Sequence, residues 1–204
     1  MNFLDFRNEN IDRCCFSVYG LGNGSRGAVS SNLSRWTSEN KLIKLRKGWY
    51  AFPERTVDFS DRMFIANSIY SPSYVSLFTA LSYYEMIPES VTAVTSVSTL
   101  KTAEFNSGIG LFSYRSLKPS LFWGYEPVTG PRQLPYLLAS AEKALLDLLY
   151  LYPYYSTDEE IEGLRLDEDY MRKEFNWGRM EEYLARASSK ALAARVAIVK
   201  RIYY

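Results

Sequence analysis

The segment from residue 28 to residue 52 constrains the fold of this chain more than any other. It begins with an apolar stripe at Val29, Leu33 and Trp36, which follow one another at i, i+4 and i+7. This spacing predicts an amphipathic helix over residues 28–40, because residues three and four apart share one face of a helix. Asn40 is a suitable residue to end it.

A hairpin pattern follows at once. Residues 41–46 alternate with period two, Lys47-Gly48 is a turn signal, and residues 49–52 form a second strand pattern that ends at Pro53. Before the helix, residues 2–18 predict one or two short helices, and residues 20–27 contain four glycines and predict a loop. The predicted order is therefore short helices, a loop, an exposed polar helix and a basic hairpin. This is the order of elements in a winged helix-turn-helix.

The remainder of the chain alternates between strand and helix patterns. We expect helices near 58–71, 71–84 and 140–151, strands at 91–100, 103–105, 109–117 and 121–128, a break at 131–135, and tail helices near 157–164, 168–174, 177–187 and 189–201. The fold class predicted is therefore α+β. Residues 1–56 form the winged helix-turn-helix, and residues 57–204 form a mixed α/β C-terminal domain with a helical tail from about 156.

Charge is divided unevenly between these two parts. Residues 1–56 hold nine Lys and Arg and five Asp and Glu, whereas the remainder holds fifteen against eighteen. A basic N-terminal part favours a nucleic-acid partner, although a few charges either way are ordinary.

Short polar side chains and cations on the exposed face of the helix are suited to major-groove contact. Cations around the hairpin turn are suited to phosphate contact. The candidate DNA-binding residues are Arg26, Ser30, Ser31, Asn32, Ser34, Arg35, Lys44, Arg46 and Lys47. An ordinary solvated helix face and edge-strand charges that discourage sheet pairing are the alternative interpretations.

The chain has no histidine, which removes Ser-His-Asp and Cys-His catalysis and most zinc chemistry. Its two cysteines, Cys14 and Cys15, are adjacent, so we expect reduced and partly buried thiols. We expect no secretory leader and no membrane-spanning segment, because apolar runs such as 145–151 are far shorter than about 20 residues. These features predict a cytoplasmic protein that is not an enzyme and needs no metal or cofactor.

Three short motifs are typical of enzymes but lack the surrounding residues that the chemistry requires. Gly22 to Gly27 matches G-x-G-x-x-G but lacks the βαβ context and the later acid. Gly24-Ser25 lacks the paired carboxylates of a nucleotidyltransferase. Glu39 and Lys41 have the E-x-K form of some nucleases, without a partner aspartate.

Three charged residues fall within the apolar helix pattern of residues 140–151. Asp147 follows Lys143 by four residues and can pair with it, and Glu142 lies beside them. We expect a solvated stripe on this helix, with a surface for another protein or for DNA as the alternative.

Several segments resemble the AbiEi-type antitoxins of bacterial type IV toxin–antitoxin systems. Residues 42–53 resemble the wing of this family, and residues 73–84 and 91–95 also match it. Residues 139–147, ASAEKALLD, are similar to the family's PEKALLD segment, with Ala141 where proline is usual. The resemblance covers about residues 16–150.

The resemblance implies a repressor that binds its own promoter as double-stranded DNA, with a C-terminal domain needed for antitoxin activity. It implies a functional pairing with a nucleotidyltransferase-like toxin that the antitoxin need not contact. A protein-interaction module that uses the winged helix as a scaffold, without DNA binding, is the alternative hypothesis.

Overall fold

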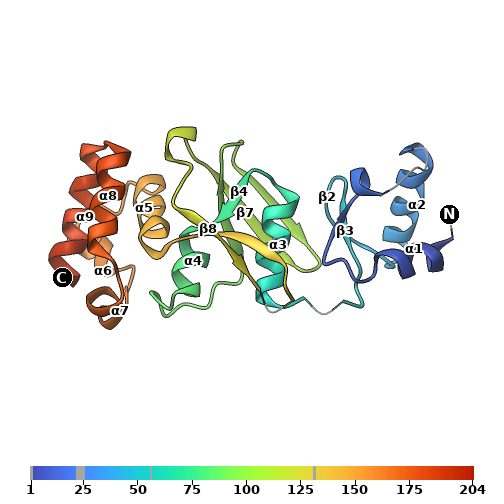
Figure 1. Cartoon of the computed structure of the whole chain (residues 1–204), viewed down its shortest axis with the longest axis horizontal. Helices are drawn as coiled ribbons and strands as arrows, with labels where there is room; N and C mark the ends of the chain where they lie inside the picture. Colours follow the sequence, from blue (N-terminus) through green and yellow to red (C-terminus); the bar gives the residue numbers. More distant parts are fainter. Residues whose placement is uncertain (1, 22–25, 56, 131) are drawn as a thin grey trace.

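The structure, a computed structural model, describes residues 2–21, 26–55, 57–130 and 132–204. The chain is an elongated α+β protein with its two termini at opposite ends (Figure 1). Its N-terminal part, on the right in Figure 1, consists of α1 (Phe3–Asn10), β1 (Phe16–Ser17), the 3-10 helix η1 (Val18–Gly20), α2 (Arg26–Ser38), β2 (Ile43–Arg46) and β3 (Trp49–Ala51).

The N-terminal part has a small aromatic core of its own. Its three strands form an antiparallel sheet in the order β1-β3-β2. Trp36 of α2 packs edge to face on Phe3 of α1 and lies 4.9 Å, between ring centroids, from Phe6. The predicted helix 28–40 and both hairpin strands are therefore present, whereas residues 2–18 form one helix and a short strand rather than helices alone.

A six-stranded mixed sheet occupies the middle of the molecule. Its strands are β4 (Ser73–Val75), β5 (Val94–Ser98), β6 (Ala103–Ser107), β7 (Gly110–Ser116), β8 (Tyr125–Thr129) and β9 (Pro135–Ala139). Their order is β6-β7-β5-β4-β9-β8, in which β5 pairs with β7 and β4 with β9 in parallel and the other neighbours are antiparallel. The 3-10 helix η2 (Pro119–Leu121) precedes β8, so the strand predicted at 121–128 begins only at Tyr125.

One expectation for this part was wrong, and one strand was missed. A single helix was predicted over 71–84, but β4 comes first and α4 (Leu77–Tyr83) begins only after Ser76. The break predicted at 131–135 is present in residues 132–134, but no strand was predicted where β9 begins at Pro135. Both strands gain backbone hydrogen bonds from neighbours distant in sequence, which local patterns do not reveal.

Helices cover the sheet and continue it toward the C-terminus. α3 (Phe59–Ile69) packs against β4, β5 and β9, and α4 packs against β5 and α5 (Ala141–Leu151). The tail consists of α6 (Asp158–Glu162), α7 (Glu168–Lys173), α8 (Trp177–Ala187) and α9 (Lys190–Tyr203), and α5 contacts both α8 and α9. The predicted tail helices are thus confirmed. Among the described residues, none of the helices has the length and hydrophobicity needed to span a bilayer.

The N-terminal part is joined to the central sheet by apolar packing. Cys14, Cys15, Leu45 and Ala51 belong to the same buried cluster as the interior of the central sheet. The small sheet is therefore covered on both faces, by α1 and α2 on one side and by the central part on the other. Cys14 and Cys15 are both buried free thiols, as expected.

Candidate nucleic-acid interface

The helix α2 separates a buried stripe from an exposed polar face. Leu33 and Trp36 are buried, whereas Ser30, Ser34 and Arg35 are exposed. The helix ends in a Schellman-type arrangement, which satisfies carbonyls of the last turn. The N–H of Asn40, at φ 56°, donates to the Thr37 carbonyl (3.1 Å), and the N–H of Lys41 donates to the Trp36 carbonyl (2.8 Å).

Arg35 is held in place by polar neighbours on the same helix. Its Nη2 donates to Asn32 Oδ1 (3.1 Å), and its Nε lies 3.9 Å from Glu39 Oε1. Lys41 Nζ lies 2.6 Å from Glu39 Oε2, and this hydrogen bond holds the pKa of Glu39 below its usual value. Glu39 is thus an ionised carboxylate that pairs with Lys41 and lies beside Arg35. These basic partners differ from the metal-binding arrangement of a nuclease carboxylate.

A β-bulge divides the hairpin cations between two faces of the small sheet. Lys44 pairs with Tyr50, but Arg46 pairs with Trp49, so Leu45 is an extra residue between them. Without the bulge, residues 44 and 46 would share a face, because side chains alternate along a strand. The bulge instead aims Arg46 at the central part of the molecule.

Arg46 is therefore committed to a contact within the chain. Its guanidinium lies 5.3 Å from the Tyr70 ring centroid and 5.1 Å from that of Phe105, and its Nη1 donates to the Ile69 carbonyl. We correct its assignment from DNA contact to the packing of the hairpin on α3 and β6. Lys44 and Lys47 remain exposed.

The hairpin turn lies next to η1, the element that precedes α2 and contacts it. The N–H of Val18 in η1 donates to the Gly48 carbonyl (2.9 Å), where Gly48 adopts φ 83°. In Figure 1 the β2–β3 turn, η1 and the N-terminal end of α2 follow one another along the upper edge of the N-terminal part. The exposed face of α2 and the turn cation Lys47 thus belong to neighbouring elements.

The structure adds one candidate that sequence patterns missed. Tyr19 in η1 is 77% exposed, and a Cβ built on Gly48 would lie 3.7 Å from its Cε2. An aromatic residue beside a glycine-rich loop was its only signal. Among the predicted residues, Ser31 is exposed and Asn32 half-buried on α2, while Arg26 begins α2 with a side chain outside the described residues.

A second polar cluster lies in the interior, where a solvated stripe was expected. Glu142, Lys143 and Asp147 of α5 are buried, at 3%, 0% and 1% exposure. The expectation was wrong because α4, α8 and α9 all pack on α5. The predicted pairing of Lys143 with Asp147 is confirmed.

Hydrogen bonds satisfy this buried pair almost completely. Tyr74 Oη and Ser76 Oγ each donate to Asp147 Oδ2 (2.8 Å), and Lys143 Nζ donates to Tyr74 Oη (2.9 Å). Burial raises the pKa of Asp147 and lowers that of Lys143, while the attraction between the two groups opposes both shifts. No member of the cluster is exposed, and its hydrogen bonds join β4 and the start of α4 to α5.

No protein-family model and no curated protein matches this chain.

Proposed function

We propose that residues 1–56 form a winged helix-turn-helix that binds double-stranded DNA, and that the chain is a transcriptional repressor. The observation that carries this proposal is the exposed face of α2, with Ser30, Ser34 and Arg35, which η1 connects to the hairpin turn. The order α1, β1, η1, α2, β2, β3 supports it, with η1 in the place of the helix that precedes the recognition helix and β2–β3 as the wing.

Each group in this interface has a role that its chemistry suits. Ser30, Ser31, Asn32 and Ser34 would meet base edges or phosphates with short hydrogen-bonding groups, and Arg35 would contact a guanine or a phosphate. Lys44 and Lys47 would hold the backbone beside the wing, with Arg26 near the start of the helix.

We further propose that the chain acts in the cytoplasm as the antitoxin of a type IV system, paired with a nucleotidyltransferase-like toxin. The resemblance in residues 42–53, 73–84 and 139–147 supports this role. Two of these segments meet in the buried cluster, because residues 73–84 contain Tyr74 and Ser76 and residues 139–147 contain Lys143 and Asp147.

DNA binding is tested by mobility shift on the DNA upstream of the gene, across a range of salt concentrations. Arg35→Ala and Lys47→Ala should each weaken binding and lower the log–log salt slope by about one if each residue contacts a phosphate. Arg165→Ala is the matched control, because Arg165 is an exposed arginine of the tail that pairs with Glu89.

Unchanged affinity in the Arg35→Ala, Lys47→Ala double variant would contradict the assigned interface. Absence of any DNA binding at low salt, together with capture of a protein partner, would favour the scaffold hypothesis. The antitoxin role predicts a neighbouring nucleotidyltransferase-like gene, and co-expression with such a gene tests the role separately. Growth should be rescued by the intact chain.

A further inference from the structure

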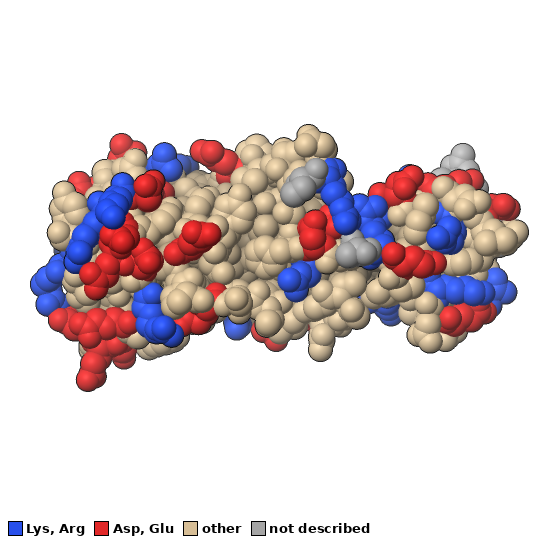
Figure 2. Space-filling model, turned by 90° about the horizontal axis from the view of Figure 1, so that it is seen from below, with Lys and Arg blue, Asp and Glu red and all other residues tan. Residues whose placement is uncertain are grey.

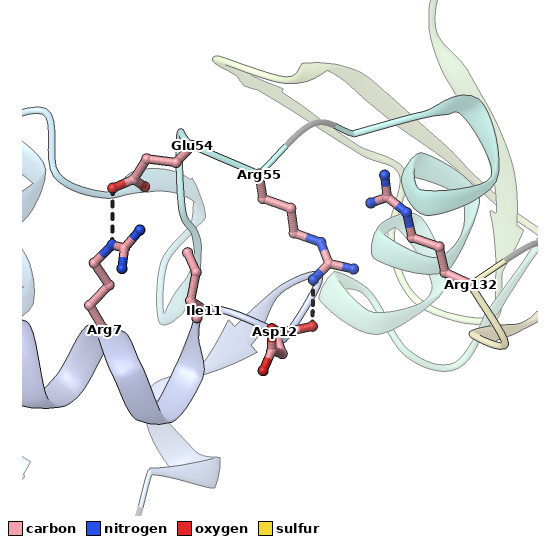
Figure 3. Close-up of a pocket in the computed structure, with 6 residues that line it drawn as sticks. All are labelled: Arg7, Ile11, Asp12, Glu54, Arg55 and Arg132. Atoms are coloured by element: carbon pink, nitrogen blue, oxygen red, sulfur yellow. Dashed lines mark hydrogen bonds and ion pairs between the residues drawn. The ribbon is translucent and has the colours of Figure 1, made fainter.

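A pocket of about 400 Å³ lies where the N-terminal part meets the central sheet (Figure 3). Its lining consists of Arg7, Ile11, Asp12, Glu54, Arg55 and Arg132. The three arginines come from α1, from the segment after β3 and from the segment between β8 and β9. On the face seen in Figure 2, basic side chains cluster at this junction, whereas the tail carries acidic and basic side chains side by side.

Arg55 differs from the other two arginines in its partners. Arg7 Nε lies 3.3 Å from Glu54 Oε1, and Arg132 Nη1 lies 2.6 Å from Asp61 Oδ2. Arg55 Nη1 donates only to the Asp12 backbone carbonyl, and its Nε is buried with no hydrogen-bond acceptor among the described residues. The buried Nε is out of reach of a ligand, but the Nη2 of Arg55 is not a buried atom and forms no hydrogen bond with a described residue, so it is the donor that a ligand in the pocket can meet.

The charges around the pocket indicate how much negative charge a bound ligand would carry. Three arginines and two carboxylates line it, so it carries a small positive excess rather than the strong field that a polyanion requires. Guanidinium groups bind planar or tetrahedral oxyanions through paired N–H donors. In Figure 3 the Arg7 and Arg55 side chains approach the pocket from opposite sides of Ile11.

We propose that this pocket binds a small oxyanion, either inorganic phosphate or the phosphate group of a monoester, through Arg55 with Arg7 as its neighbour. A DNA duplex on α2 is not the occupant. The buried stripe of α2 faces α1 through the contact of Trp36 with Phe3, so the exposed face of α2 points away from α1. The pocket, in contrast, is lined by residues near the C-terminal end of α1.

The test is calorimetric titration of the full chain with sodium phosphate against sodium chloride at constant ionic strength. The wild type and Arg165→Gln should bind phosphate saturably. Arg55→Gln and Arg7→Gln should weaken binding by about tenfold or more, because each removes charged donors. Arg132 is left intact, since its loss would leave the buried Asp61 without this partner.

The source of the ligand is decided by a second titration with a nucleoside monophosphate. Tighter binding of the monoester than of phosphate assigns the site to a metabolite, and equal binding assigns it to free phosphate. The absence of saturable phosphate binding in the wild type would overturn the proposal. So would a phosphate affinity in both Arg55→Gln and Arg7→Gln that equals that of the wild type. Loss of DNA affinity with a lower salt slope in Arg55→Gln, without phosphate binding, would assign the arginine to DNA instead.

Discussion

Lys143 and Asp147, one turn apart on α5, form an ion pair that is removed from solvent in the centre of the molecule. Tyr74 and Ser76 supply hydrogen bonds that complete it. Isolated buried charges are strongly disfavoured, so the pair is tolerated only because each member neutralises the other. It therefore links β4 and the start of α4 to α5.

Removal of one partner should destabilise the protein severely. Asp147→Ala leaves the Lys143 ammonium buried without its counter-ion, and we expect a loss of about 3–5 kcal/mol in the free energy of unfolding. Urea denaturation followed by circular dichroism measures it. Asp169→Ala is the matched control, since Asp169 forms an exposed pair with Lys173 at the same spacing and should matter little. A similar effect in both variants would contradict the role of burial.

Gly124 should not tolerate a side chain. It adopts φ 78°, and a Cβ there would lie 2.9 Å from both Cγ and Cδ of Lys143. Gly124→Ala should therefore cost about 1–3 kcal/mol through strain and overpacking around the buried lysine. Gly20→Ala is the control, because a Cβ at Gly20 meets nothing within 4 Å. Equal thermal midpoints for the two variants would argue against this close contact.

Arg46 and Lys47 should differ in what their loss affects. Arg46→Ala removes a cation that lies over the adjacent rings of Tyr70 and Phe105, so we expect about 1 kcal/mol of lost stability and an unchanged salt slope of DNA binding. Lys47→Ala should instead leave the stability unchanged and lower the salt slope of DNA binding. Thermal unfolding and salt-dependent mobility shifts distinguish the two effects, and a lower slope in Arg46→Ala would return that residue to the DNA interface.

Glu39 should weaken DNA binding. It is an ionised carboxylate 3.9 Å from Arg35 at the end of α2, where it competes with a phosphate for that cation. Glu39→Gln should raise DNA affinity by roughly twofold to fivefold, the range expected for an exposed ion pair. Glu159→Gln, on exposed α6, provides the control. Fluorescence anisotropy at low salt measures the change, and weaker binding would show that Glu39 positions Arg35 instead.

The two cysteines should resist alkylation in the folded protein. Burial raises the pKa of both Cys14 and Cys15 to about 12, from an ordinary value of 9.0. At pH 8 the thiolate fraction should fall about a thousandfold below that of a free thiol, because three pKa units separate them. Mass spectrometry after iodoacetamide treatment should detect modification only in denaturant. Rapid labelling of either cysteine in the folded protein would contradict their burial between the N-terminal part and the central sheet.

Local patterns in the sequence predicted the elements that short-range interactions define. The starts of α5 and α7 illustrate this. Ser140 caps α5 by accepting from the N–H of Lys143, and Asp167 caps α7 by accepting from the N–H of Tyr170. The end of α2 at Asn40 is of the same kind. Caps and helical periodicity involve residues a few positions apart, so they can be recognised without the fold.

The candidate site was predicted less completely than the elements that hold it. The exposed face of α2 follows from the stripe of Leu33 and Trp36, and the structure places Ser30, Ser34 and Arg35 on it. Arg46 could not be assigned correctly, because period-two alternation contains no sign of the bulge at Leu45. The pocket around Arg55 was also absent from the prediction, since its residues come from three distant segments.

By itself the sequence determined α2, α5 and the tail helices, the hairpin and the partnership of Lys143 with Asp147, because each depends on neighbours within a few residues. Only the tertiary structure decided that this pair is buried, that β4 and β9 are central strands and that Arg46 faces inward. The physical reason is common to all three. Strand pairing, burial and side-chain direction are set by contacts between segments far apart in the chain, where the free energy depends on what covers a residue rather than on what precedes it.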